Sequence, residues 1–265
     1  MLEMDFNLYD HNFCESSIYS DGQHPEYLNA ISSLFISFIG INGLFKSRLS
    51  LLLSMCYSTM AVNGVLSYFY HYYNSIGWGL LDRMSMILLG LNTTYLFTNH
   101  LKKILVFSDV KSASITNVLI HVVIISYYSL LLTVAGLHKE ELFNILFGLF
   151  LASLIVYMYF IDKNAQLFNV NDKIVSLGWK GVKYIFCSAF FWIATENLCY
   201  RFSFIKYLFG HVWWHIFVSY GGYLVSLVPQ YINLLSKMDD EMIYINYDMF
   251  GIPYLDYSHG RGSIV

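Results

Sequence analysis

Charged residues are scarce in this chain. They make up 12% of its 265 residues, about half of the roughly 25% found in an average soluble domain. Proline occurs only 3 times, and we find no linker, low-complexity segment or internal repeat. The net charge is −3, and no basic patch alternates with aromatic residues, so nothing indicates a nucleic-acid partner. With 57% hydrophobic residues, the composition predicts a single-domain integral membrane protein.

Long apolar runs take the place of the missing charges. A membrane-spanning helix needs about 20 mostly apolar residues, and seven segments of this kind follow one another along the chain. We therefore predict an all-α integral membrane protein that folds as a seven-transmembrane-helix bundle. The predicted spans are residues 28–46, 50–71, 78–98, 114–136, 142–161, 178–199 and 210–235.

The basic residues orient this bundle, because loops on the cytosolic side are enriched in Lys and Arg. If the N-terminus is lumenal or extracellular, most of the basic residues lie on the cytosolic side. These are Lys46, Arg48, Lys102, Lys103, Lys111, Lys163, Lys173, Lys180, Lys183, Lys237 and Arg261. The opposite side then holds Lys139, Arg201 and Lys206. We therefore expect a lumenal N-terminus and a cytosolic C-terminus, with a membrane domain over 1–240, a short lumenal segment over 1–27 and a cytosolic tail over 241–265.

Polar residues interrupt three of the apolar segments at one membrane depth. His211 and His215 open the last segment four residues apart, which places both imidazoles on one helical face. His71 ends the second segment and Asp82 opens the third. In the predicted topology all of these lie near the lumenal side, as does Ser67. Ionisable residues inside a membrane are costly and are usually functional.

These residue types suit a hydrolytic zinc site. Three neutral imidazoles leave one position of a tetrahedral zinc ion open for water, whose pKa then falls toward about 7. We expect His71, His211 and His215 to bind the metal, Asp82 to act as general base, and Ser67 to hold the water or a developing oxyanion. Each residue alone has a plainer reading: a packed histidine, a helix-bonded serine, or an ion pair of Asp82 with Arg83.

The spacing Ser67-x3-His71-x10-Asp82, with Met86 following, resembles the alkaline ceramidases, and so does His211-x-x-Trp214-His215. The wider seven-helix group also contains adiponectin and progestin receptors and a GPI-remodelling family. An N-terminal Phe-Cys-Glu run, followed by a Glu and an Asn before the first span, is similar to the ceramidase branch. The resemblance covers the chain up to about residue 240.

The resemblance implies an intramembrane zinc-dependent amidase that hydrolyses ceramide, taken from the bilayer, to a sphingoid base and a fatty acid. It also implies a multi-pass protein of the endoplasmic reticulum or Golgi membrane. The alternatives are a receptor-like member of the group, a GPI-lipid-remodelling ester hydrolase, and a degenerate protein with a structural metal. A structural zinc usually has four protein ligands, whereas only three are evident here.

The family also carries a lumenal calcium site, whose ligands by position would be Asn12, the carbonyl of Phe13, Glu15, Ser17 and Glu26. Asn12 stands where the family has Asp, and Ser17 stands where it has Asn. The lost negative charge is expected to weaken calcium binding. The plainer reading is an acidic, solvated lumenal segment.

Two other departures lie near the predicted site. Thr195 occupies a position where the family usually has Asp, and Glu196 follows it; Arg83 replaces an acidic residue after Asp82. Cys14 and Cys199 both fall on the lumenal side, which is oxidising in a secretory membrane. We predict a disulfide bond between them, and the resemblance supports the same pair.

Overall fold

The computed structural model describes residues 5–6, 10, 13–18, 25–46, 50–105, 110–166, 169–235 and 243–257, without the side chains of 100–105 and 110–117. Seven long α-helices account for most of these described residues. Two short 3-10 helices and a β-hairpin complete the secondary structure there. The helices are α1 (Tyr27–Lys46), α2 (Leu51–Tyr73), α3 (Ile76–Leu105), α4 (Val110–Gly136), α5 (Glu140–Lys163), α6 (Asp172–Leu198) and α7 (Gly210–Leu235). The 3-10 helices are η1 (Ser16–Ile18) and η2 (Ile205–Leu208), and the strands are β1 (Ile243–Tyr247) and β2 (Pro253–Tyr257).

Each predicted span overlaps one helix, and most boundaries agree within a few residues. The larger differences are at the C-terminal end of α3 and the N-terminal end of α6, where polar residues extend the helices beyond the apolar runs. In the described part of the chain, α1, α2, α5 and the stretch Val118–Gly136 of α4 are long and apolar enough to cross a membrane. The helices α3, α6 and α7 are equally long but carry charged or imidazole side chains, which lower their hydropathy.

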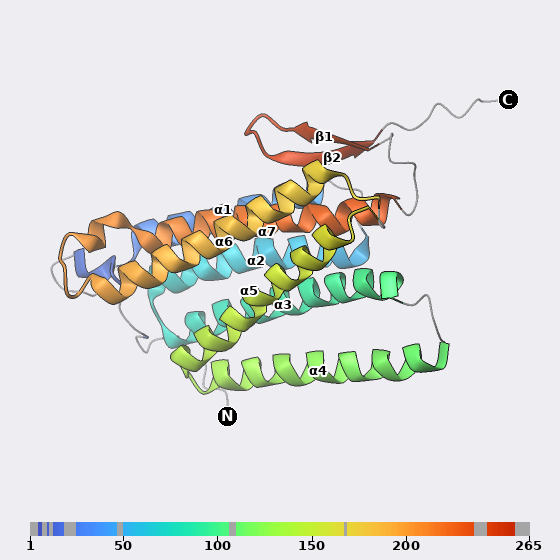
Figure 1. The fold of residues 1–265 in the computed structure, drawn as a ribbon. Coiled ribbons are helices and arrows are strands. Elements are labelled where there is room, and N and C mark those ends of the chain that lie inside the picture. Colours follow the sequence, from blue (N-terminus) through green and yellow to red (C-terminus); the bar gives the residue numbers. More distant parts are fainter. Residues whose placement is uncertain are drawn as a thin grey trace.

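Consecutive helices run in opposite directions, as expected for helices joined by short loops, and α5 crosses the bundle obliquely (Figure 1). The closest packing is between α6 and α7 and between α1 and α2. One hydrophobic core joins residues of α1, α2, α3, α5, α6 and α7. A second, smaller core holds α4 against α3 and α5, so α4 forms the outer edge of the bundle.

Small residues let the central helices approach closely. A Cβ atom on Gly64 of α2 would collide with the backbone of Ser37 in α1, and one on Gly221 of α7 would meet the carbonyl oxygen of Gly181 in α6 at 2.6 Å. Glycine is therefore required at both crossings, as is usual where helices pack in membranes. The first crossing brings Ser33 of α1 beside Ser67 of α2, with 3.1 Å between their hydroxyl oxygens.

The C-terminal residues form an element that the polar composition of the predicted tail did not indicate. The strands β1 and β2 pair in antiparallel register and lie along the side of the bundle (Figure 1). Ile252 and Leu255 join the main core, and the hydroxyl of Tyr223 in α7 donates to the carbonyl of Pro253 at 2.8 Å. The described part of this tail thus packs on the membrane domain rather than extending from it.

Asp248 fixes the turn of this hairpin. Its carboxylate accepts hydrogen bonds from the backbone N–H groups of Phe250 and Ile252 and from the amide of Asn42 in α1. Partial burial raises the pKa of Asp248, but these hydrogen bonds and the nearby Lys46 outweigh that effect and hold the pKa below its ordinary value. The ionised carboxylate therefore ties the hairpin to α1.

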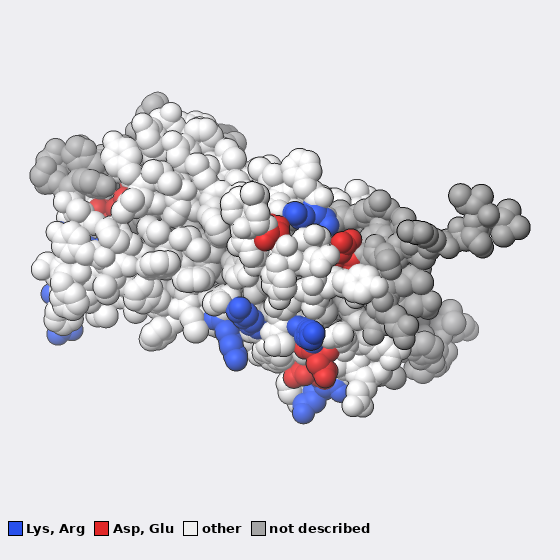
Figure 2. All heavy atoms as spheres, turned by 90° about the horizontal axis from the view of Figure 1, so that it is seen from above, with Lys and Arg blue, Asp and Glu red and all other residues white. Residues whose placement is uncertain are grey.

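The surface carries few charges on the face in Figure 2, where the charged side chains form one group near the middle of the view and a smaller one at its left end, with an uncharged area between them. Large apolar side chains are exposed along several helices, among them Ile31 (62%), Phe45 (85%), Val123 (66%) and Phe190 (77%). An apolar surface of this extent needs an apolar environment. It fits a protein that is surrounded by lipid.

Candidate metal centre and lipid cavity

Three histidines converge at one end of the bundle. His71 lies in the last turn of α2, and His211 and His215 lie in the first two turns of α7. Their ring centroids are 4.6–5.1 Å apart, and one ring nitrogen from each lies within 4.8 Å of the others. All three side chains are buried. The helix α1 packs antiparallel to α2 and parallel to α7, so its N-terminal end brings the last turn of α2 and the first turns of α7 together.

Oxygen atoms face the Nδ1 atoms of these histidines. Glu26 Oε2 is 2.7 Å from Nδ1 of His71, and the Ser32 hydroxyl is 2.9 Å from Nδ1 of His215. Glu196 Oε1 lies farther away, at 3.8 Å from Nδ1 of His211. Such partners fix ring orientation and leave Nε2 to a metal. The three histidines therefore fit a zinc ion that has one open position, and their partners would orient the rings.

Sequence patterns did not reveal the residues that face the Nδ1 atoms of the histidines, here called the outer partners. Ser32 lies on an apolar helix, and a serine there more often bonds to its own backbone. The family pattern places Glu26 among the calcium ligands rather than beside a histidine. The convergence of α1, α2 and α7 is what makes both residues neighbours of the histidines.

Asp82 lies beside this cluster on α3 and is 8% exposed. The amide of Asn63 in α2 donates to its Oδ1 at 3.1 Å, and the hydroxyl of Ser67 is also hydrogen-bonded to it. Asn63 in turn donates to the hydroxyl of Ser85 at 2.8 Å. Asn63, Ser67 and His71 are four residues apart, so they share one face of α2. That spacing was the available signal for Asn63, which the sequence analysis missed.

Arg83 points toward other acidic partners. Its guanidinium lies 3.0 Å from Glu140 at the start of α5 and 3.6 Å from Asp10 in the N-terminal segment. Asp10 also accepts a hydrogen bond from the Tyr70 hydroxyl at 2.8 Å. Arg83 thus joins α3, α5 and the N-terminal segment, which leaves the Asp82 carboxylate to Asn63 and Ser67.

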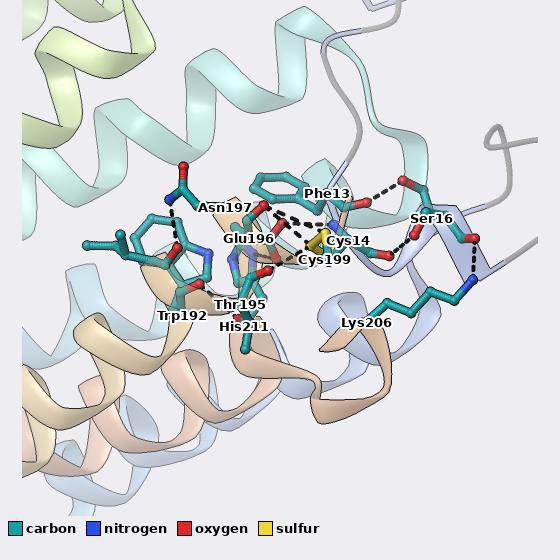
Figure 3. The surroundings of a disulfide bond; sticks show 12 residues. Phe13, Cys14, Ser16, Trp192, Thr195, Glu196, Asn197, Cys199, Lys206 and His211 are labelled. Carbon is teal, nitrogen blue, oxygen red and sulfur yellow. Dashed lines mark hydrogen bonds and ion pairs between the residues drawn. A yellow bond between two sulfur atoms is a disulfide. The ribbon is translucent and has the colours of Figure 1, made fainter. Parts of the chain in front are cut away.

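A disulfide bond joins Cys14 to Cys199, with a Cα–Cα distance of 6.0 Å (Figure 3). The same junction carries a hydrogen bond of 2.8 Å from the backbone N–H of Cys14 to Glu196. Lys206 of η2 donates to the carbonyl of Ser17. Together they fasten the N-terminal segment to the end of α6, beside His211.

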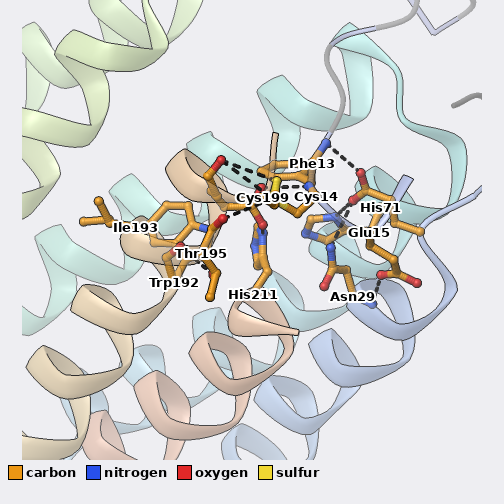
Figure 4. A network of polar contacts seen from close by, with 12 residues as sticks. Phe13, Cys14, Glu15, Asn29, His71, Trp192, Ile193, Thr195, Cys199 and His211 are labelled. Carbon is orange, nitrogen blue, oxygen red and sulfur yellow. Dashed lines mark hydrogen bonds and ion pairs between the residues drawn. A yellow bond between two sulfur atoms is a disulfide. The ribbon is translucent and has the colours of Figure 1, made fainter. Parts of the chain in front are cut away.

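Four of the candidate calcium ligands belong to the described residues, and two of them, Phe13 and Glu15, are shown in Figure 4. Glu15 accepts from the backbone N–H groups of Leu28 at 2.7 Å and Asn29 at 2.8 Å, where the helix dipole stabilises a negative charge. Glu26 accepts from the backbone N–H of Phe13 at 3.0 Å and binds His71. The carbonyl of Phe13 accepts from Ser16 and the hydroxyl of Ser17 donates to Cys14. Asn12 lies outside the described residues, and calcium binding stays a prediction.

Thr195, which stands where the family usually has Asp, points its hydroxyl to the backbone. It donates to the carbonyl oxygens of Phe191 and Trp192 within α6, and it packs against Gly210 at the start of α7. The carboxylate nearest to His211 at this end of α6 is instead that of Glu196, one residue later in the sequence.

A cavity of about 210 Å³ leads from the histidines into the bundle. Its walls come from six helices, with Phe13 at the polar end. Ser67, His71, Asp82, His211 and His215 line that end, whereas apolar side chains of α2, α3, α5 and α7 line most of the remainder. A cavity that is polar at one end and apolar along its length suits an amphipathic lipid.

Comparison with protein-family models identifies a match to the family described as Ceramidase, over residues 9–256. No curated protein sequence matches the chain. The family match covers all seven helices, the three histidines, Ser67, Asp82 and both disulfide cysteines. The chain therefore belongs to the ceramidase family, whose members hydrolyse the amide bond of ceramide.

Proposed function

We propose that the chain is an intramembrane zinc-dependent amidase that cleaves ceramide into a sphingoid base and a free fatty acid. One observation carries this proposal: three buried histidines, Ser67 and Asp82 meet at the polar end of an apolar cavity. The cavity would hold a lipid chain while the amide bond lies against the polar residues.

His71, His211 and His215 would hold the zinc ion, because each offers a ring nitrogen to the same point. Zinc bound there would supply a Lewis acid that activates water and polarises the amide carbonyl. Asp82 would take the proton from the attacking water and deliver it to the leaving amine, as a general base and then a general acid. Ser67 would donate a hydrogen bond to the carbonyl oxygen as negative charge develops on it.

Two residues would support these roles. Asn63 donates to Oδ1 of Asp82, which would aim the second carboxylate oxygen toward the substrate. Glu26 binds Nδ1 of His71, which would hold that ring with Nε2 toward the metal. Calcium, if bound near Glu15 and Glu26, would stabilise the segment that supplies Glu26.

We also propose that all seven helices span the membrane, with a lumenal N-terminus and a cytosolic C-terminus, in the endoplasmic reticulum or Golgi membrane. The alternating helix directions (Figure 1) and the distribution of Lys and Arg support this topology. The disulfide bond near the N-terminal segment supports a lumenal position for that end.

Removal and return of the metal tests the proposed reaction. Purified protein in detergent micelles would be treated with phenanthroline and assayed with ceramide and with an ester analogue that has the same two chains. We expect ceramide hydrolysis to stop and to return on addition of zinc but not of calcium. Undiminished hydrolysis by the zinc-free protein would contradict the proposed mechanism, and cleavage of the ester alone would contradict the amidase assignment.

A further inference from the structure

The end of the cavity farthest from the histidines has a defined wall. On α2 the most distant lining residues are Cys56 and Tyr57, on α3 Phe97, and on α7 Ser226. The hydroxyls of Tyr57 and Ser226 are 2.6 Å apart, so a hydrogen bond connects α2 to α7 across this end. The wall is therefore a direct contact between two helices.

Further contacts hold this wall in place. Tyr57 is 2% exposed, and its ring centroid lies 5.8 Å from that of Tyr223. Tyr223 is fixed in turn by its hydrogen bond to Pro253 of the hairpin. On the other side, Phe97 stacks on Tyr157 with 4.0 Å between centroids. Movement of Tyr57 would disturb α7 and the hairpin together.

The depth of the cavity matches one hydrocarbon chain. Tyr57 precedes Ser67 by ten residues of one helix, and Ser226 follows His215 by eleven. At a rise of 1.5 Å per residue, both separations are about 15 Å. This is roughly half of the hydrocarbon thickness of a bilayer, which is about 30 Å. A single extended lipid chain therefore reaches from the polar site to Tyr57.

Gly222 lies along this path on α7, between the polar end and Ser226, and lines the cavity. A Cβ atom added there would meet no other atom within 4 Å. The position thus leaves room for a Cβ atom, and a larger side chain there would take up cavity volume. Gly148 of α5 is equally unobstructed but does not line the cavity, which makes it a matched control.

We propose that the Tyr57–Ser226 contact is the floor of the lipid cavity and sets the longest hydrocarbon chain that the site accepts. The inference rests on the proposed function, because it concerns the chain attached to the scissile amide. A chain that is too long for the floor leaves methylene groups outside the cavity or displaces the amide from the site. A smaller side chain at the floor therefore favours longer hydrocarbon chains, and a larger side chain in the cavity favours shorter ones.

The test compares two variants that act in opposite directions. In Tyr57→Leu the ring and its hydrogen bond are removed, and in Gly222→Leu the cavity is shortened. The ratio of kcat/KM for lignoceroyl-ceramide to that for octanoyl-ceramide is expected to rise about tenfold or more in the first variant and to fall about as much in the second. Tyr73→Leu on the exposed end of α2 and Gly148→Leu are expected to leave the ratio unchanged.

Two substrate series show which chain occupies the cavity. In one the acyl chain is varied on a constant sphingoid base, and in the other the base is varied under a constant acyl chain. A change of the kcat/KM ratio in either series supports the role of the floor. The series in which the ratio changes shows whether the acyl chain or the sphingoid base occupies the cavity. Unchanged ratios in both series, with Tyr57→Leu and Gly222→Leu still active, would overturn the inference.

A binding experiment separates this inference from the proposed reaction. In the Asp82→Asn background, fatty acids from octanoic to lignoceric acid would compete with a fluorescent fatty acid. Tyr57→Leu is expected to favour longer competitors and Gly222→Leu shorter ones, even if no variant hydrolyses ceramide. A competition profile that is identical in all variants would refute the floor, whatever the outcome of the hydrolysis assay.

Discussion

Glu26 provides the sharpest test of how the N-terminal segment contributes to the proposed zinc site. Its side chain is fully buried, and Oε2 lies 2.7 Å from Nδ1 of His71. Glu26→Gln keeps the shape of the side chain but removes the charge that strengthens this hydrogen bond. A hydrogen bond to a charged group contributes about 1.5–3 kcal/mol, and loss of such a partner typically lowers metal affinity about 10–100-fold. We therefore expect zinc affinity to fall by this factor.

The measurement is a zinc titration of the purified protein in competition with a chromophoric chelator. Glu15→Gln is the matched control, because Glu15 lies in the same segment but binds the backbone N–H groups of Leu28 and Asn29. That variant is expected to lower the unfolding temperature and to leave zinc affinity unchanged. The titration would be run with and without calcium, so that a loss of calcium is not mistaken for an effect on His71. Wild-type zinc affinity in Glu26→Gln would refute the role of Glu26.

Three further predictions concern the base, the disulfide bond and the hairpin. Asp82→Asn is expected to lower kcat about 10²–10⁴-fold with no loss of bound zinc; an active variant would exclude Asp82 as the base. Cys14→Ser is expected to cost about 2–5 kcal/mol of stability, measured by thermal unfolding in detergent, whereas Cys187→Ser, at an exposed free thiol, should be neutral. The pKa of Asp248 is lowered in the folded state, so its contribution to stability is full above about pH 4 and disappears as the pH falls through that lowered pKa. The stability difference between wild type and Asp248→Asn should follow this course, and a difference that does not depend on pH would contradict it.

The helices were predictable from the sequence because apolar runs of the right length are a strong local signal. The meeting of His71 with His211 and His215 followed from the predicted topology, since their spans end at one membrane depth. The outer partners could not be found in this way, because Glu26, Ser32 and Glu196 become neighbours of the histidines only through helix packing and the disulfide bond.

The hairpin was not predictable from the sequence, for a different reason. Residues 243–257 contain Tyr, Asp and Asn in a short stretch with no long apolar run, so they read as a polar tail. Their structure depends on contacts with α1 and α7 that are distant in sequence, such as Asn42 with Asp248 and Tyr223 with Pro253. The alternation of Ile243 and Ile245 with the exposed Tyr244 and Asn246 is the one local signal in β1, and it does not indicate which helices the strand contacts.

Zinc content measured beside ceramide hydrolysis tests the central claim most directly. Wild-type protein and His215→Ala would be purified in detergent, their zinc counted by mass spectrometry, and sphingoid base release followed with each. We expect about one zinc ion per wild-type chain and release of sphingoid base, with both lost in His215→Ala. Zinc-free wild-type protein that hydrolyses ceramide, or a His215→Ala variant that retains zinc and activity, would contradict the account.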